Sequence, residues 1–186
     1  GNFEKVVFEI VEDGKLTITP ATLTVTTDSD SKVYDGTALT ADGRITGLVN
    51  GETATLNITG SQTNVGSSNN TYSIVWGTAK ASNYTVEEEL GTLNVTPVEA
   101  EVVVKVKGNT STETYTGTEQ TVTGYTVESI SNPLYTTDHF TFTGTATASG
   151  VDANTYAMGL KAENFKNTNG NFEKVVFEIV EDGKLT

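Results

Sequence analysis

The stretch GNFEKVVFEIVEDGKLT fills Gly1–Thr17 and returns, letter for letter, at Gly170–Thr186. Near-identical tandem segments are typical of repeat proteins, so we interpret the chain as one period of a longer array plus a short overlap. Repeats that are kept alike serve length, valency or mechanical continuity more often than a single active site. The sequence therefore favours a structural or adhesive role.

The repeated stretch contains two runs that are rich in β-branched residues. Lys5–Val11 reads KVVFEIV and Leu16–Pro20 reads LTITP, and Asp13-Gly14 between them suits a tight turn. We therefore predict a β-hairpin whose alternating apolar side chains bury one face. Residues 1–19 are assigned to the C-terminal hairpin of the preceding repeat or, alternatively, to an N-terminal extension of the domain that follows.

The composition excludes several classes of function. The chain has 186 residues, 24 acidic and 11 basic side chains, a net charge of -13, one histidine and no cysteine. This charge disfavours nucleic-acid binding, and the lack of cysteine removes disulfides and thiolate metal sites. No apolar run approaches the ~20 residues that cross a bilayer, so we expect no membrane insertion of this fragment. Threonine, valine, tyrosine and glycine predict an all-β chain without a helix longer than a turn or two.

A second, weaker repeat lies inside the first. LTITP at Leu16–Pro20 returns as LNVTP at Leu93–Pro97, which divides the chain into domain A (20–97) and domain B (98–186). Three further matches keep their order in A and B: Tyr34-Asp35-Gly36-Thr37 with Tyr115-Thr116-Gly117-Thr118, Thr59-Gly60-Ser61 with Thr143-Gly144-Thr145, and Asn70-Thr71-Tyr72 with Asn154-Thr155-Tyr156. The unit is therefore interpreted as a pair of diverged sister domains.

For each domain we predict a β-sandwich of about six or seven strands with Ig-like or Greek-key-like connections, arranged with its neighbour in a rod-like array. A β-grasp-like domain is the alternative, disfavoured because no helical segment is found. Apolar residues change parity at the entry to domain A, from Leu16 and Ile18 to Leu23 and Val25. The last strand of one domain should therefore run through Pro20 into the next domain with its buried face turned over.

Four motifs of domain A carry a resemblance to a known family: Tyr34-Asp35-Gly36-Thr37, Asn64-Val65-Gly66, Asn83-Tyr84-Thr85 and Gly91–Pro97. Together they resemble the MBG and YDG type of repeat found in large bacterial surface proteins and adhesins. Domain B keeps the pattern loosely, with Thr116 in place of the aspartate and Phe165 where A has Tyr84. The resemblance implies a secreted, extracellular array on a bacterial cell surface or cell wall, and it carries no catalytic residues.

The candidates for chemistry are few, and each has a plainer interpretation. His139 beside Asp138 has no nucleophile motif near it and is interpreted as a loop residue. Glu87-Glu88-Glu89 is interpreted as the charged tip of a hairpin. Asp28-Ser29-Asp30-Ser31 could suit calcium but lacks the spacing of an EF-hand loop, so a solvated turn is favoured. We expect no catalytic residue, no metal site, no cofactor and no enzymatic activity, and the ligand-binding residues are unknown.

Aromatic residues and lysines give the remaining expectations. Trp76 could serve as an aromatic platform on which a sugar ring stacks. However, Tyr72, Ile74 and Trp76 align with Tyr156, Met158 and Leu160 of domain B. Since Leu160 is an ordinary aliphatic residue, this alignment favours a core position for Trp76. Tyr34 and Tyr115 are interpreted as packed anchors at tight turns. Lys105 and Lys107 alternate with valines and should face water, which disfavours an internal isopeptide bond.

The leading hypothesis is a stalk or spacer in a bacterial surface adhesin, which presents a distal adhesive tip and bears tension. The alternative is that the repeats themselves bind host glycan or extracellular protein weakly and multivalently. Adjacent repeats are the expected partners. If the first and last strands of a domain leave at opposite ends, tension should shear their ladder. The free first copy, Gly1–Thr17, should lie against domain A or pair with a neighbouring molecule, including by domain swapping.

Overall fold

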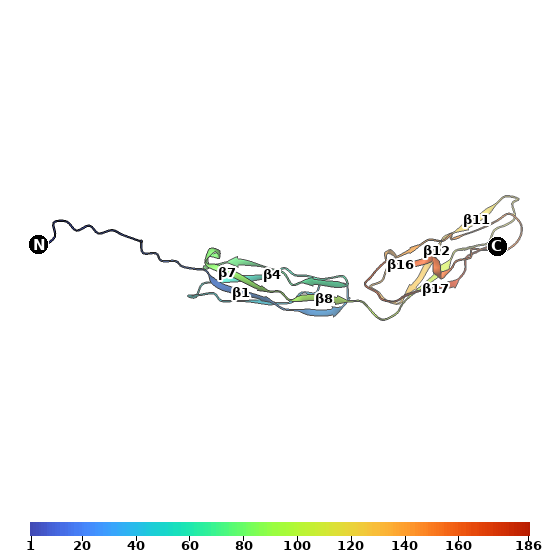
Figure 1. Cartoon of the computed structure of the whole chain (residues 1–186). Coiled ribbons are helices and arrows are strands. Elements are labelled where there is room, and N and C mark those ends of the chain that lie inside the picture. The colour runs from blue at the N-terminus through green and yellow to red at the C-terminus, as the bar shows by residue number, and fades with distance from the viewer.

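The computed structural model describes residues 1–186 and contains β-strands and short turns only. Figure 1 shows two elongated groups of strands placed end to end, with an extended N-terminal segment leading into the first group. The only helical elements are three 3₁₀ turns of three residues each. The prediction of an all-β chain is confirmed.

Domain A contains eight strands, and they pair only with one another: β1 (Ala21–Thr27), β2 (Asp30–Val33), β3 (Gly43–Thr46), β4 (Ala54–Ile58), β5 (Gly66–Asn69), β6 (Tyr72–Trp76), β7 (Tyr84–Glu89) and β8 (Thr92–Thr96). Their sheets have the orders β3-β1-β7, β2-β8-β5 and β4-β6. The domain has more and smaller elements than the sequence suggested, because its long strands are interrupted where the chain changes sheet.

Domain B contains ten strands with a similar plan: β9 (Val102–Gly108), β10 (Thr110–Ser111), β11 (Gln120–Thr123), β12 (Tyr125–Ile130), β13 (Phe140–Phe142), β14 (Thr147–Gly150), β15 (Tyr156–Ala157), β16 (Phe165–Asn167), β17 (Val175–Glu181) and β18 (Lys184–Leu185). Its sheets have the orders β12-β9-β17, β10-β18-β15, β11-β14 and β13-β16. All sheets in both domains have two or three strands, and the two-layer sandwich stays a prediction.

Alternation of apolar and polar residues explains the central strands. Leu23 and Val25 of β1 are fully buried, and Val102, Val104 and Val106 of β9 are as well. Lys105 is exposed, and Lys107 forms an ion pair of 2.6 Å with Glu181. The prediction that both lysines point away from the valine face is confirmed.

The predicted hairpins are wrong. β17 pairs in parallel with β9, whereas β18 pairs with β10 and β15, so the chain changes sheet at Asp182-Gly183 instead of turning back. Likewise β7 and β8 belong to different sheets, and Glu87-Glu88-Glu89 lies along β7, not at a tip. Gly91 is needed because a Cβ there would overlap the backbone of Asp28. The glycine therefore serves the close crossing of two strands, not a hairpin turn.

The two copies of the repeated stretch lie in different environments. Gly170–Thr186 supplies β17 and β18, and Phe177 is 9% exposed, whereas Gly1–Thr17 forms no strand and Phe8 is 92% exposed. The expectation that the first copy lies against domain A is wrong. β1 pairs with β3 on one edge and with β7 on the other, so the first strand of the domain has no free edge that the first copy could join.

Candidate functional site

In both domains the first strands pair in parallel with the last strands. β1 pairs with β7 from Ala21↔Tyr84 to Thr26↔Glu89, and β9 pairs with β17 from Val102↔Val175 to Lys107↔Glu181. The second and last strands repeat the arrangement, with β2 parallel to β8 and β10 parallel to β18. Since parallel neighbours run in the same direction, the chain enters each domain at one end and leaves it at the other, as Figure 1 shows.

This topology determines how a domain responds to a stretching force applied at its two ends. A force along the chain slides the first strand against the last, so the hydrogen bonds between them are loaded side by side. An antiparallel hairpin pulled at its two ends would instead open one bond at a time. The parallel pairs are therefore the candidate tension-bearing element of each domain.

A buried polar cluster fixes the point where the strands of domain A cross. The Asn70 side chain is fully buried, and its Nδ2 donates to the carbonyl oxygens of Asp28, Ala41 and Asp42 at 3.0, 3.0 and 3.2 Å. Its backbone N–H donates to the Gly91 carbonyl at 2.8 Å. The Asn70 side-chain amide is thus the donor for the Asp28 and Ala41 carbonyls, and it shares the Asp42 carbonyl with the Asp28 N–H. The sequence did not single out Asn70 for this role.

A threonine completes the same cluster. The Thr27 hydroxyl donates to the Asn70 carbonyl at 2.8 Å, and its Oγ1 accepts the Gly91 N–H at 2.9 Å. Thr27 ends β1, and Gly91 stands between β7 and β8. The cluster therefore links the first and last strands where both change sheet.

Domain B fixes its crossing with a carboxylate. The two oxygens of Asp182 accept the backbone N–H groups of Gly159 and Leu160, each at 2.9 Å. Met158 donates its N–H to the Gly183 carbonyl at 2.6 Å, as Asn70 does to Gly91 in domain A. The two domains share the crossing but satisfy it with different side chains.

Asn171 joins the two domains. Its Oδ1 accepts the Val65 N–H at 2.8 Å, its Nδ2 donates to Asn64 Oδ1 at 3.1 Å, and its carbonyl accepts the Val98 N–H at 2.9 Å. The residue is buried and belongs to the second copy of the repeated stretch. A single asparagine therefore connects domain B to the Asn64-Val65-Gly66 motif of domain A and to the linker.

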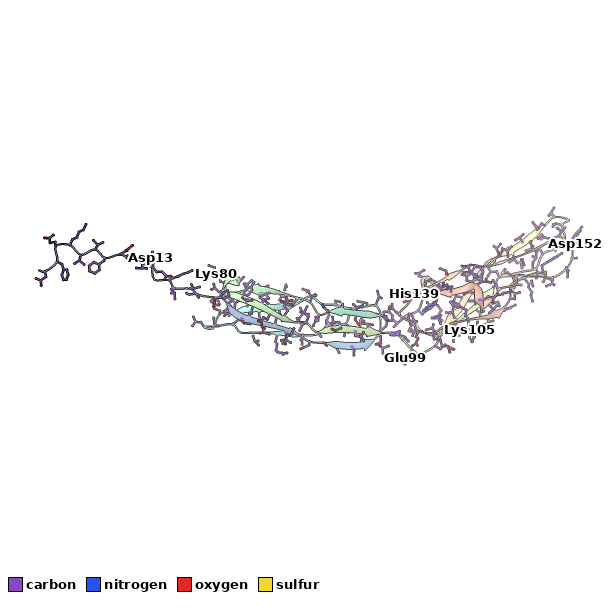
Figure 2. The ribbon with its side chains drawn as sticks, viewed as in Figure 1. Asp13, Lys80, Glu99, Lys105, His139 and Asp152 are labelled. Carbon is purple, nitrogen blue, oxygen red and sulfur yellow. The ribbon has the colours of Figure 1, made fainter.

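Aromatic packing supports the same junction. The Tyr34 and Phe172 rings meet edge to face at 5.7 Å, and Phe172 is buried against Tyr135 at 5.1 Å. A Cβ at Gly36 would lie 3.4 Å from Leu134 of domain B. The Tyr-Asp-Gly-Thr loop of domain A thus faces domain B, and Figure 2 labels Glu99 of the linker and His139 of domain B at this junction.

The turn that carries Tyr34 is held by Asp35. Its Oδ1 accepts hydrogen bonds from Lys32 Nζ at 2.7 Å, from the Thr37 N–H at 2.8 Å and from the Thr37 hydroxyl at 2.7 Å. The Lys32 ammonium, followed by the Thr37 donors, holds the pKa of Asp35 well below its usual range. Gly36 has a φ of 79°, so the turn also needs glycine.

The corresponding tyrosine of domain B behaves differently. Tyr115 is 63% exposed and lines the same hollow as Asp152, which Figure 2 labels at the end of B that lies away from A. The prediction of two packed tyrosine anchors is therefore right for Tyr34 and wrong for Tyr115. The difference arises because Tyr34 has a neighbouring domain to pack against.

The one histidine lies at the junction and is used structurally. His139 Nδ1 accepts the Thr136 N–H at 3.1 Å, and the His139 carbonyl accepts the Thr168 N–H at 2.8 Å and the Tyr135 hydroxyl at 3.0 Å. It ends a 3₁₀ turn, and Asp138 beside it is exposed. The hydrogen bonds of His139 fix the loop around Tyr135.

The acidic segments of domain A, Asp28–Ser31 and Glu87–Glu89, form hydrogen bonds and an ion pair within the domain. Asp28 lies 3.7 Å from Arg44, and Asp30 Oδ1 accepts the Ser31 N–H at 2.8 Å, where β1 gives way to β2. Glu88 Oε1 accepts the Tyr72 hydroxyl at 2.5 Å. Burial and Glu88 together raise the pKa of Tyr72 to about 12.

Trp76 is half-buried: it packs against the core cluster of Leu23, Ala79 and Tyr84, so the expected core position is right in part, and it also lines a surface groove. Its ring stacks on Tyr84 at 6.0 Å, and together with Tyr72, Ile74 and Glu88 it borders an open groove of about 450 Å³. The alignment that favoured a core position is wrong in its register. Leu185 of domain B corresponds to Leu93 of domain A. The strand partner of Leu185 is Tyr156, and the strand partner of Leu93 is Ser68. Tyr156 therefore corresponds to Ser68 and not to Tyr72.

Residues 23–94 match the family model of the MBG domain (YGX type). The resemblance expected for domain A is thus confirmed over most of its length. No curated protein matches the chain, and no solved structure does. None of the helical turns has the length and apolar character that crossing a membrane requires.

Proposed function

We propose that this chain is one period of a tension-bearing stalk in a bacterial surface adhesin, which holds a distal adhesive tip away from the cell wall. The MBG domain suggests a repeat domain of a surface-type protein, and the duplicated Gly1–Thr17 stretch supports a tandem array. The expected partners are the adjacent repeats of the same chain. The extracellular location, on the cell surface or cell wall, belongs to this proposal.

The parallel pairing of first and last strands is the observation that carries the proposal. A spacer under tension has to keep its length, and a sheared ladder resists extension until many hydrogen bonds break together. The junction around Asn171 supports it as well, since hydrogen bonds limit bending between A and B. We also propose that the chain has no catalytic activity, since its one histidine is engaged with the backbone of its own turn.

Single-molecule extension tests the stalk role. The chain is pulled from its two ends, with a marker domain of known unfolding force at each side. We expect two unfolding events at high force, and the longer domain B should release more chain than A. Unfolding of both domains at forces far below that of the marker would contradict the proposal.

A second candidate function is weak, multivalent binding of glycan by domain A. The half-buried Trp76 and Tyr72 beside the Glu88 carboxylate favour it, because sugar rings stack on aromatic faces and bond to carboxylates. A glycan array probed with a multimerised chain tests it. Binding that Trp76→Ala abolishes and Val75→Ala retains would support this function, since Val75 lies on the opposite face of β6. Absence of binding in the multimer would exclude it.

A further inference from the structure

A hollow of about 400 Å³ opens at the end of domain B that lies away from A. Tyr115, Gln120, Tyr156 and Leu185 line it, and Asp152, labelled in Figure 2, marks its rim. Leu185 is buried beneath the hollow, while the Tyr115 ring above it is largely exposed. The hollow therefore lies over the end of the B core, with Leu185 at its base.

The corresponding position of domain A is filled by a side chain of its own last strand. Leu93 pairs with Asp30 in β8–β2, as Leu185 pairs with Ser111 in β18–β10. Two residues beyond Leu93 comes Val95, which is 1% exposed and packs with Leu39, Tyr34 and Val65. Tyr34 corresponds to Tyr115, so Val95 occupies in A the place of the hollow in B.

The backbone of domain B could extend the β10–β18 ladder in the same way as the β2–β8 ladder of domain A. In A the ladder extends to Val33↔Thr96, and the Tyr34 N–H donates to the Thr96 carbonyl at 2.8 Å. In B the Glu113 N–H already donates to the Thr186 carbonyl at 2.8 Å. Adding residues to β18 would bring the Tyr115 N–H to the donor position that Tyr34 occupies in A.

The duplicated stretch identifies the residues that follow in an array. Thr17 is followed by Ile18-Thr19-Pro20, and Thr17 is the counterpart of Thr186. Ile18 stands two residues after Leu16, as Val95 stands two residues after Leu93. At the entrance to domain A, Leu16 and Ile18 are apolar and almost fully exposed, although Leu185, the counterpart of Leu16, is buried.

We propose that the hollow at Tyr115 is the receptor for Ile18-Thr19-Pro20 of the following repeat unit. This segment continues β18 alongside β10, places the Ile18 side chain over Leu185 and covers Tyr115. The core of each domain B is thereby completed by residues of the next copy. The inference depends on the tandem arrangement and is independent of a stalk role.

The two kinds of junction in the array then differ in length. Five residues, Pro97–Glu101, separate β8 from β9 between A and B. Between B and the next A, Pro20 alone would separate the end of the continued strand at Thr19 from β1, which begins at Ala21. Consecutive Cα atoms lie about 3.8 Å apart, so the ends of the two strands can be no more than roughly 8 Å apart. The next domain A must therefore pack directly on this end of B.

The test adds the tripeptide Ile-Thr-Pro after Thr186 and compares it with an added Asp-Thr-Pro. With the isoleucine we expect the thermal midpoint of domain B to rise by roughly 5 to 15 °C, while that of domain A stays unchanged. Hydrogen exchange at the Tyr115 N–H should slow in the same protein. Equal midpoints for the two extended proteins, or an unprotected Tyr115 N–H with the isoleucine present, would overturn the proposal.

A variant of the receptor separates specific docking from a general effect of a longer chain. Tyr115→Ala should remove most of the rise in thermal midpoint that Ile-Thr-Pro gives. It should hardly change the thermal midpoint of the unextended protein, because the ring is exposed there. If Tyr115→Ala leaves the gain intact, the isoleucine does not bind in this hollow. If the pulling experiment gave a low unfolding force, the stalk role would be refuted, but the stabilisation of domain B by the added Ile-Thr-Pro would be unaffected.

Discussion

The duplicated stretch allows one substitution to be made twice in the same local sequence. Phe177→Ala removes a ring that packs on Phe140 at 5.1 Å and on Phe165 at 5.4 Å in the core of domain B. Phe8→Ala removes the identical residue of the first copy, whose ring is 92% exposed. Because the other sixteen residues of the stretch are the same in both copies, the substitution changes the local strand propensity equally at the two positions.

The expected magnitudes differ widely. Truncation of a buried phenylalanine costs about 3 to 5 kcal/mol, from the lost burial and the cavity that remains. For a domain of this size each kcal/mol lowers the midpoint by roughly 4 to 8 °C, so Phe177→Ala should lower that of domain B by at least about 12 °C. Phe8→Ala should change the free energy of unfolding by less than about 0.5 kcal/mol, as an exposed substitution does.

Differential scanning calorimetry on the full chain measures both variants, and the transition of domain A serves as the internal reference. The reasoning is refuted if Phe8→Ala destabilises the protein as much as Phe177→Ala does. That result would mean that the first copy is packed in solution, for example by replacing Gly170–Thr186 in another molecule. Light scattering would then reveal a dimer.

Three further predictions concern the crossing and the core. Gly91→Ala should prevent domain A from folding, because the added methyl group overlaps the Asp28 backbone, whereas Gly14→Ala should be neutral by circular dichroism. Asn70→Ala should cost domain A about 2 to 4 kcal/mol in chemical denaturation, because it leaves a cavity at a fully buried side chain and removes the donor of the Asp28 and Ala41 carbonyls, and Asn57→Ala on the exposed face of β4 should cost less than about 0.5 kcal/mol. Burial raises the pKa of Tyr135 to about 12. The folded state thus keeps a proton that the unfolded state releases near pH 10, so domain B should lose stability between about pH 10 and 12. In Tyr135→Phe this pH dependence should be weaker.

The strand character and the burial pattern could be predicted from the sequence. Alternation in Leu23-Thr24-Val25 and in Val102–Val106 is set by the two-residue period of a strand, which needs only local information. The same alternation predicted the outward-facing lysines. The Tyr-Asp-Gly motif pointed to domain A, although not to its position against domain B.

The pairing of the strands could not be predicted in the same way. Asp182-Gly183 has the composition of a hairpin turn, yet its two strands find partners that are distant in the sequence. A glycine that permits a close crossing and a glycine that permits a turn look alike in sequence. The role of Asn70 depends on three carbonyls supplied by other segments, so no local pattern reveals it.

The most direct test of the tension-bearing claim compares two pulling directions on domain A. The chain has no cysteine, so introduced pairs are unique attachment points. Handles at Thr22→Cys and Thr96→Cys load the domain along its length and shear β1 against β7. Handles at Thr22→Cys and Thr85→Cys attach to residues that face each other in the ladder, so the force separates the two strands pair by pair. We predict a several-fold higher unfolding force along the length, and equal forces in the two directions would contradict the account.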